Sequence, residues 1–301
     1  MITPSQAERI GDALGLRLTG FSATADGQGR TFFATTTDAQ PVLLKWYGAD
    51  DGPLPRALDY AETLRRRGYP TARTIAHGPV PRGHPPGAAG EGYAVVQEQL
   101  PGEPAWHGLN SSLLEEVLTA VEIQAGAVAG TAPATGSDGA ALLTGVVHHD
   151  SLGWWRAARH SGEEIAELCT ELGAWVRAVS PPEPRHDLVH FDLGFPNILV
   201  DEDRLTGIVD MDQLTAGDRA VDLVSLAFHF ERLHRLGGWL PAPDTVGRLA
   251  ERALRISDRS WWRHAVAYYA LFQLSCSWPP DEAVRQAAAA GTVRRMMAHP
   301  D

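Results

Sequence analysis

Short runs of alternating apolar and polar residues near the start of the chain predict β-strands. We expect a helix over residues 4–14, then strands over 16–21, 31–36 and 42–47. Turn-forming residues at 26–29 and 38–41 separate these strands. A charged and aliphatic helix over 56–68 and another strand over 93–97 follow. The first hundred residues therefore predict a β-sheet with accompanying helices.

After the Pro101-Gly102 break, the spacing of apolar residues changes to that of helices. Helices are expected over 111–127, 162–179, 220–236, 245–256 and 261–277. Residues 131–145 are rich in Gly, Ala, Thr and Ser and predict a connector without regular structure. The fold class is therefore α+β, with a β-sheet domain over 1–100 and a mainly helical domain over 101–301.

Residues 188–212 interrupt the helical pattern. Two short apolar runs, 198–200 and 207–209, flank a polar turn, as in a β-hairpin. If the turn centres on Asp203-Arg204, Asn197 and Asp210 lie at equal distances from it and come together at its open end. An amide oxygen and a carboxylate suit Mg²⁺. Asp192, on the loop leading to this end, could then accept a proton.

The order His-x-Asp-x₄-Asn, hairpin, Asp resembles the catalytic and metal-binding loops of protein-kinase-like phosphotransferases. The closer similarity is to the aminoglycoside phosphotransferase / choline kinase family of small-molecule kinases. It rests on residues 190–199, 208–210 and 217–223. The resemblance implies a bilobal protein-kinase-like fold, with a nucleotide-binding N-lobe over 1–100. The C-lobe over 101–301 would hold the catalytic loop and the acceptor.

The resemblance also implies roles for residues of the 188–223 region. Asp192 would be the catalytic base, and Asn197 and Asp210 would bind Mg²⁺. His190 and Asp222 would support the catalytic loop. Such a set fits phosphoryl transfer, which depends on charge neutralisation and on in-line placement of the attacking hydroxyl.

In the N-lobe, the resemblance implies that Lys45 holds the α- and β-phosphates of ATP or GTP. The backbone of Glu98 and Leu100 would bind the purine. Gly27 and Gly29 lie where a phosphate-binding turn is expected, although they do not form a G-x-G-x-x-G motif.

Two further features of these motifs bear on the prediction. Lys45 is the only lysine among 26 basic residues, which favours a task that Arg cannot perform, and it needs an acidic partner. Glu62 is the preferred partner and Asp59 the alternative, three residues earlier on the same helix face. Phe191 stands where many members of the family have Gly.

Charge and composition limit the class of partner. The net charge of −11 argues against nucleic-acid binding, which needs a basic surface. Residues 111–180 carry nine acidic and three basic side chains, which suits a cationic acceptor, although solvated helix faces would give the same excess. No apolar run approaches the roughly 18 residues of a membrane span. The two cysteines form no C-x-x-C motif, and we expect a cytoplasmic protein, as a monomer or weak dimer.

The sequence thus predicts a kinase that transfers the γ-phosphate of ATP or GTP to a hydroxyl of a small molecule, an antibiotic above all. The alternatives are a metabolic kinase of an amino alcohol or sugar, a non-catalytic nucleotide-binding protein and, from the Asp210-Met211-Asp212 motif, a glycosyltransferase. His148-His149-Asp150 could bind a metal or flank the acceptor. The pairs Trp154-Trp155 and Trp261-Trp262 could be core residues or line an acceptor pocket.

Overall fold

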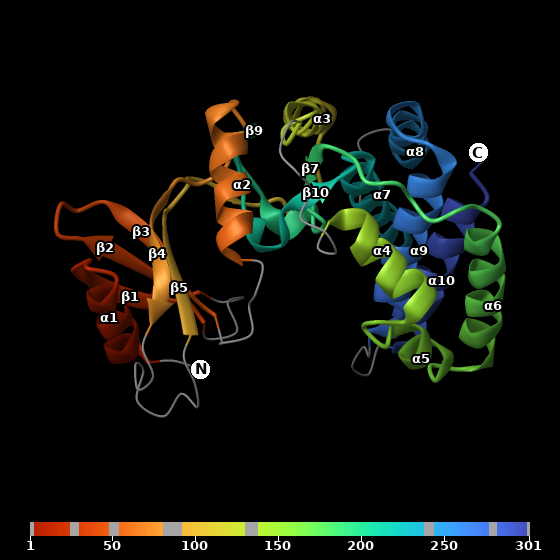
Figure 1. Cartoon of the computed structure of the whole chain (residues 1–301), viewed down its shortest axis with the longest axis horizontal. Coiled ribbons are helices and arrows are strands. Elements are labelled where there is room, and N and C mark those ends of the chain that lie inside the picture. The colour runs from red at the N-terminus through yellow and green to blue at the C-terminus, as the bar shows by residue number, and fades with distance from the viewer. Residues whose placement is uncertain are drawn as a thin grey trace. The chain divides into compact units, whose positions relative to one another are not determined.

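The computed structural model divides the chain into two compact units. It describes residues 3–24, 30–47, 54–80, 92–129, 138–237, 244–276 and 282–299. One unit comprises Met1–Gly102 and Thr206–Asp212, and the other comprises Glu103–Leu205 and Gln213–Asp301 (Figure 1). The first unit ends two residues after the expected boundary. It also takes in residues 206–212, which the sequence had assigned to the second domain.

The first unit contains a five-stranded antiparallel sheet in the order β1-β2-β3-β5-β4. Its elements are α1 (Pro4–Ala13), β1 (Leu18–Ala23), β2 (Thr31–Thr36), β3 (Pro41–Tyr47), α2 (Leu54–Arg66), β4 (Thr74–Val80) and β5 (Gly92–Glu98). Thr3 begins α1 with a capping box to Gln6.

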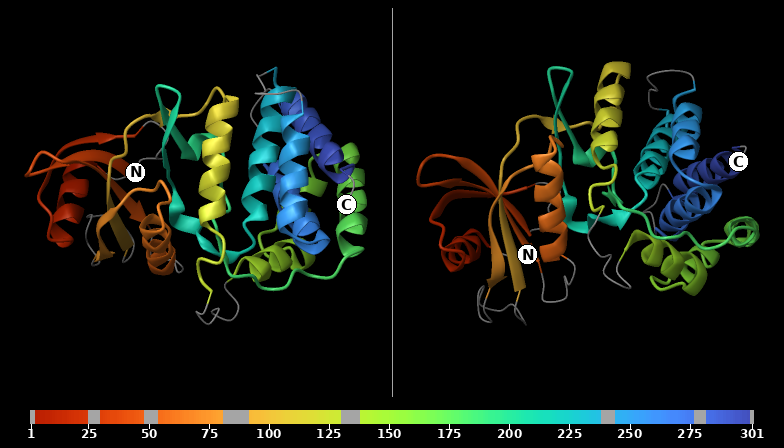
Figure 2. Two further views of the ribbon diagram at one scale, coloured as in Figure 1. Left: turned by 90° about the horizontal axis from the view of Figure 1, so that it is seen from above. Right: turned by 45° about the horizontal axis from the view of Figure 1, so that its top comes forward.

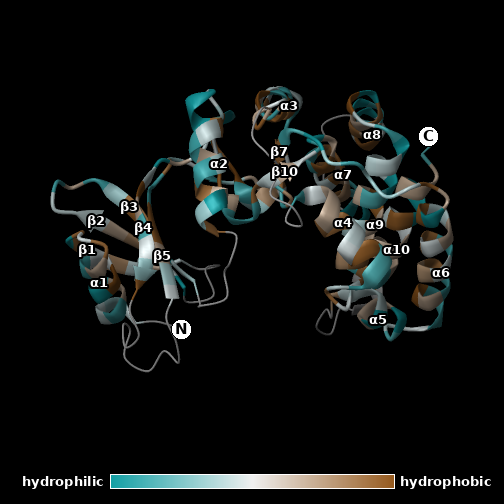
Figure 3. Cartoon of the chain, in the orientation of Figure 1, coloured by the Kyte–Doolittle hydropathy of each residue, from teal (hydrophilic) through white to brown (hydrophobic). Residues whose placement is uncertain are grey.

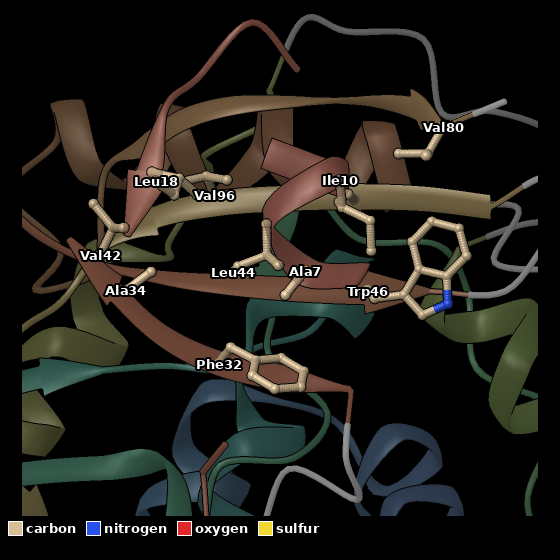
Figure 4. Close-up of a cluster of buried hydrophobic side chains, with 11 residues drawn as sticks. Ala7, Ile10, Leu18, Phe32, Ala34, Val42, Leu44, Trp46, Val80 and Val96 are labelled. Carbon is tan, nitrogen blue, oxygen red and sulfur yellow. The ribbon is translucent and has the colours of Figure 1, made fainter. Parts of the chain in front are cut away.

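Strand β3 is central in this sheet, and its side chains alternate between two environments. Val42, Leu44 and Trp46 are buried in a core that also contains Ala7 and Ile10 of α1 (Figure 4). The intervening side chains point to the other face, because successive residues of a strand alternate. On that face, Leu54 and Leu58 of α2 pack against Val95 of β5. Lys45 pairs in register with Val95 and therefore lies on the face that α2 covers.

The second unit is mainly helical (Figure 2). Its helices are α3 (Ser111–Ile123), α4 (Gly139–His149), α5 (Trp154–Arg159), α6 (Glu163–Arg177), α7 (Ala220–Arg235), α8 (Thr245–Ile256), α9 (Arg259–Ser275) and α10 (Glu282–Met297). Polar and apolar positions interleave along helices such as α6 (Figure 3). By contrast, α7 and α9 are buried over most of their length and lie in the core of the unit.

Short strands carry the segments between these helices. Strand β7 (Asp187–Val189) pairs with β10 (Thr215–Gly217), and β6 (Glu103–Pro104), β8 (Ile198–Asp201) and β9 (Arg204–Ile208) form a second small sheet. The chain passes back into the first unit within β9. Of the helices in the described part of the chain, none is long and apolar enough to cross a membrane.

The structure corrects several expectations. Strand β4 was not predicted, because Gly78 and Pro79 interrupt the alternation of apolar and polar residues within it. The connector expected over 131–145 is partly helical, because Asp138 caps the start of α4 by accepting a hydrogen bond from the Ala141 amide. Helices α5 and α10 were also not predicted. Gly27 and Gly29 lie outside the described residues.

The turn of the expected hairpin lies one residue earlier than the sequence indicated. It is formed by Glu202 and Asp203, both with positive φ (44° and 62°), as in a two-residue type I′ turn. With this turn, the position symmetric to Asn197 is Ile208. The equal spacing that paired Asn197 with Asp210 therefore does not hold.

Candidate active site

In the first unit, Lys45 is the centre of a charged cluster. Its Nζ lies 2.6 Å from Oδ1 of Asp210 and 3.4 Å from Oδ2 of Asp212. Tyr47, two residues along β3 and hence on the same face, donates a hydrogen bond from its hydroxyl to Asp212. The 3-10 turn Met211–Gln213 begins directly after Asp210, whose φ of 64° is in the left-handed region. These contacts join one positive group to two carboxylates.

Burial and charge have opposite effects on the pKa values in this cluster. Burial alone would lower the pKa of Lys45, whose side chain is 12% exposed, but the charges of Asp212 and Asp210 outweigh it and raise the pKa. Burial raises the pKa of Asp212, against the opposing charge of Lys45. Asp210, with 46% of its side chain exposed, is the accessible carboxylate. Lys45 is therefore held charged beside a carboxylate that a ligand can reach.

The expected pair of Lys45 with Glu62 is wrong. The Glu62 carboxylate instead accepts hydrogen bonds from Arg65 (2.7 Å) and Arg66 (2.9 Å), which follow it on α2. These bonds lower the pKa of Glu62 to about 2, with that from Arg65 contributing most. Because Arg residues three and four positions later on a helix are nearer than a neighbouring strand, the local pairs prevail.

The segment after β5 is arranged by its neighbours in the same unit. The Glu98 side chain accepts a hydrogen bond from the Arg73 amide (2.9 Å). The Leu100 side chain lies against Gly207, where a Cβ would clash with it. Among the residues that the structure describes, the Leu100 backbone amide donates to no partner. An amide in this state can bind the edge of a purine.

In the second unit, Asp222 of α7 holds the loop that follows β7. This carboxylate is fully buried and accepts hydrogen bonds from the amides of His190 (2.9 Å) and Phe191 (3.0 Å) and from the Gln124 side chain (2.8 Å). Burial raises its pKa, against the opposing effect of His190. Asp222 is thus a buried brace for the backbone that leads to Asp192.

Asp192 and Asn197 contact each other within this loop. The Asn197 amide nitrogen donates to the backbone oxygen of Asp192 (2.8 Å) and to its Oδ2 (3.0 Å). Asp192 is further fixed because its own amide donates to Nδ1 of His190 (3.2 Å). Among the described residues, Oδ1 of Asn197 accepts no hydrogen bond. The loop therefore orients a carboxylate and an amide oxygen.

Phe191 occupies a backbone conformation that usually favours glycine. Its φ is 64°, yet its ring is buried against Gly139 and Tyr268. The Tyr269 hydroxyl donates to its carbonyl oxygen (2.9 Å), and Asp222 accepts from its amide. A glycine would adopt this φ without strain, and burial of the ring offsets the strain here.

Comparison with a family model decides the class of protein. The model of the phosphotransferase enzyme family matches residues 20–255, which include the Lys45 cluster and the 190–197 loop. The chain belongs to the phosphotransferase enzyme family. It is accordingly a small-molecule phosphotransferase, acting on a hydroxyl acceptor. No curated protein sequence matches the chain significantly.

Solved structures confirm the protein-kinase-like fold of this phosphotransferase. A thermostable mutant of aminoglycoside phosphotransferase APH(4)-Ia superposes with a TM-score of 0.63 and 17% identity, over 96% of this chain and 98% of that one. Amicoumacin kinase hAmiN, in complex with AMP-PNP, Ca²⁺ and Ami, superposes with a TM-score of 0.63 and 13% identity, over 97% of this chain and 94% of that one. An aminoglycoside phosphotransferase from Alicyclobacillus acidocaldarius superposes with a TM-score of 0.60 and 16% identity, over 99% of this chain and 95% of that one.

Several residues of the candidate site were not identified from the sequence. Tyr47 could have been found, because it lies two positions after Lys45 on a strand. Gln124, Tyr269 and His229 could not, since their contacts join distant segments. The His229 ring occupies the space beside Gly194 that a Cβ would fill, and burial lowers its pKa to about 4.

The other candidates from the sequence have structural roles. Asp150 accepts a hydrogen bond from the Trp155 amide (2.9 Å) at the start of α5. His148 contacts His264, with 2.8 Å between their Nε2 atoms, rather than forming a cluster with Asp150. Trp261 and Trp262 are core residues, and Trp155 is also buried, whereas Trp154 is only half-buried.

Part of the acidic segment over 111–180 is paired within its own unit. Four of its carboxylates form ion pairs with arginines from elsewhere in the unit: Glu115, Glu116, Glu122 and Glu164. Asp138 and Asp150 accept hydrogen bonds from helix-start amides. Six of the nine acids thus have structural partners, and the cationic acceptor stays a prediction.

Proposed function

We propose that this phosphotransferase transfers the γ-phosphate of a nucleoside triphosphate, ATP or GTP, to a hydroxyl group of a small molecule, with Mg²⁺ as the metal. The observation that carries the proposal is the double fixation of the 190–197 loop. Asp222 binds two successive amides of this loop, and Asn197 binds Asp192. Such a loop presents a carboxylate in a fixed direction, as general-base catalysis requires.

Asp192 is the catalytic base in this proposal. It accepts the proton of the acceptor hydroxyl as the oxygen attacks the γ-phosphorus, and the nucleoside diphosphate leaves. Asn197 orients the carboxylate through its amide nitrogen. Because the protein itself forms no covalent bond to the phosphoryl group in this step, the precision of the loop matters more than the strength of the base.

The metal would be held by Asn197 and Asp210. An amide oxygen without a hydrogen-bond partner among the described residues and a half-exposed carboxylate are hard oxygen ligands of the kind that Mg²⁺ takes. When bound, Mg²⁺ neutralises charge on the transferred phosphate. Lys45 would hold the α- and β-phosphates, and the backbone at Glu98 and Leu100 would bind the purine.

The acceptor proposed is an antibiotic. Support comes from the relatives of similar fold, which are named as aminoglycoside phosphotransferases and an amicoumacin kinase. Identities of 13–17% leave the particular antibiotic open. A panel of antibiotics and amino alcohols, assayed for release of nucleoside diphosphate with ATP and with GTP, tests the proposal. Turnover of amino alcohols alone would replace it by a metabolic kinase.

Thermal-shift measurements provide the matching test of the nucleotide and metal. Both ATP and GTP are compared with and without Mg²⁺, and the stabilisation should require the metal. Asp210→Asn should reduce the Mg²⁺-dependent shift, and excess metal should restore part of it. A shift of the same size without metal would contradict the metal assignment.

A further inference from the structure

A line of aromatic rings runs from the catalytic loop to the surface of the second unit. Phe191 contacts Tyr268 (ring centroids 5.7 Å apart), Tyr268 contacts Trp154 (5.0 Å), and Trp154 contacts Phe272 (5.4 Å). Tyr268 and Phe272 lie one helical turn apart on α9, and Trp154 begins α5. The inner ring, Phe191, immediately precedes Asp192 in the chain. The line therefore starts at the residue before the proposed base.

The outer end of this line is open to solvent. Phe272 is 46% exposed, and Trp154 is half-buried. Large apolar side chains that remain exposed are a common feature of ligand-binding surfaces. Among the residues that the structure describes, only a few large hydrophobic side chains are as exposed as Phe272.

The hydroxyl of Tyr268 gives a second, independent observation. Tyr268 is 6% exposed, yet among the described residues its hydroxyl has no hydrogen-bond partner. The Tyr268 oxygen is not among the fully buried polar atoms that lack a partner, so a ligand can reach it and accept its hydrogen bond. Burial, followed by the charge of Asp192, raises the pKa of Tyr268 to about 12, so the phenol stays protonated and can donate.

We propose that the acceptor is an alcohol with an apolar ring next to its reacting hydroxyl. The ring stacks on Trp154 and Phe272, and a polar atom beside the hydroxyl binds Tyr268. This inference rests on the proposed function, because it takes Asp192 as the base.

A matched pair of substrates isolates the effect of the ring. Phenylalaninol and alaninol are both primary amino alcohols and differ only by the phenyl group. Release of nucleoside diphosphate gives kcat/KM for each with Mg²⁺-ATP. We expect the wild-type protein to favour phenylalaninol by about tenfold, the size of one good aromatic contact. Equal values would overturn the proposal.

Variants then assign that preference to the surface. Phe272→Ala and Trp154→Ala should each bring the ratio of the two kcat/KM values close to one. Leu236→Ala removes a side chain of similar exposure (43%) at the end of α7 and should keep the wild-type ratio. Tyr268→Phe should lower kcat/KM for both substrates together. A ratio that survives both Phe272→Ala and Trp154→Ala would also overturn the proposal.

If neither amino alcohol is phosphorylated, saturation-transfer NMR with the same pair decides the question. Stronger binding of phenylalaninol that Phe272→Ala abolishes supports the aromatic surface, and equal binding overturns it. The proposed function is judged separately, by Mg²⁺-dependent binding of ATP to the wild-type protein. If the proposed function is wrong, ATP binding will be absent, but the preference for phenylalaninol over alaninol can still be measured by NMR.

Discussion

The two units hold their proposed site residues by different kinds of interaction. In the first unit, Lys45 is held by hydrogen-bonded ion pairs with Asp210 and Asp212, and Asp210 is half-exposed. In the second, Asp192 stands on a loop whose amides are bound by the fully buried Asp222. The first arrangement can exchange partners when an anion arrives, whereas the second cannot rearrange without breaking buried hydrogen bonds.

This difference agrees with the two tasks of a phosphotransferase. Phosphates bind and leave in every catalytic cycle. In the proposed function, the Lys45 ammonium of the first unit binds carboxylates until the phosphates of a nucleotide replace them. The base must point in one direction throughout, which favours a rigid loop. Substitutions should therefore act mainly on activity in the first unit, and on both folding and activity around Asp222.

The largest effect is expected at Asp192. Asp192→Ala removes the proton acceptor and should lower kcat by about 10³-fold, in the range of general-base catalysis. Nucleotide affinity should change little, because the base contacts the hydroxyl and not the phosphates. Steady-state kinetics and calorimetric titration with Mg²⁺-nucleotide measure the two quantities. A collapse of affinity with kcat nearly unchanged would reverse the assignment of base and metal ligand.

Next in size is the buried brace. Asp222→Ala leaves three buried donors without their acceptor, on His190, Phe191 and Gln124, and should lower the free energy of unfolding by about 3 kcal/mol. Asp222→Asn retains one acceptor oxygen and should lose less. Urea denaturation measures both. A stability like that of the wild type in Asp222→Ala would show that the second unit is not held more rigidly than the first.

The fold was predictable where local pattern dominates. The order of strands and helices up to residue 100 followed from the alternation in β2 and β3 and from the breaks at Gly68 and Pro101. Strand β4 was missed because Gly78 and Pro79 lie inside it, and α4 because a run of small residues resembles a connector. In both, tertiary packing overrides weak local propensity.

For the site, the roles that the motif implies stay predictions, and the contacts between residues were predictable only in part. The bond from Asp222 to the loop backbone agrees with the role that the family resemblance implied. The partner of Lys45 was not predictable in the same way, because helix spacing gave Glu62 two closer arginines. The aromatic contacts of Phe191 join residues far apart in sequence, and no local signal encodes them.

The charged cluster of the first unit is tested by Lys45→Arg. Arg keeps the charge but replaces a compact ammonium by a longer planar fork, which does not fit between Asp210 and Asp212 in the same way. We expect kcat/KM to fall nearly as far as in Lys45→Ala, by an amount that corresponds to a loss of about 2 kcal/mol of transition-state stabilisation. Stability should change little. Wild-type kinetics in the Arg variant would show that the sole lysine is an accident of composition.

The smallest effect is expected at Glu62, the residue that the structure removes from the Lys45 cluster. Glu62→Gln breaks only the pairs with Arg65 and Arg66 on the surface of α2, which should cost about 0.5 kcal/mol of stability. The pKa of Glu62 is lowered from 4.5 to about 2 on folding, so these pairs stabilise the protein above pH 4.5. Their contribution should be lost as the pH falls from 4.5 towards 2, and Glu62→Gln should lack this part of the acid dependence in thermal melts.

The kcat/KM of Glu62→Gln should stay within twofold of the wild-type value. A loss of kcat/KM as large as that of Lys45→Arg would mean that Glu62 pairs with Lys45 during the reaction. Lys45 would then exchange its carboxylate partners, Asp210 and Asp212, for a residue of α2.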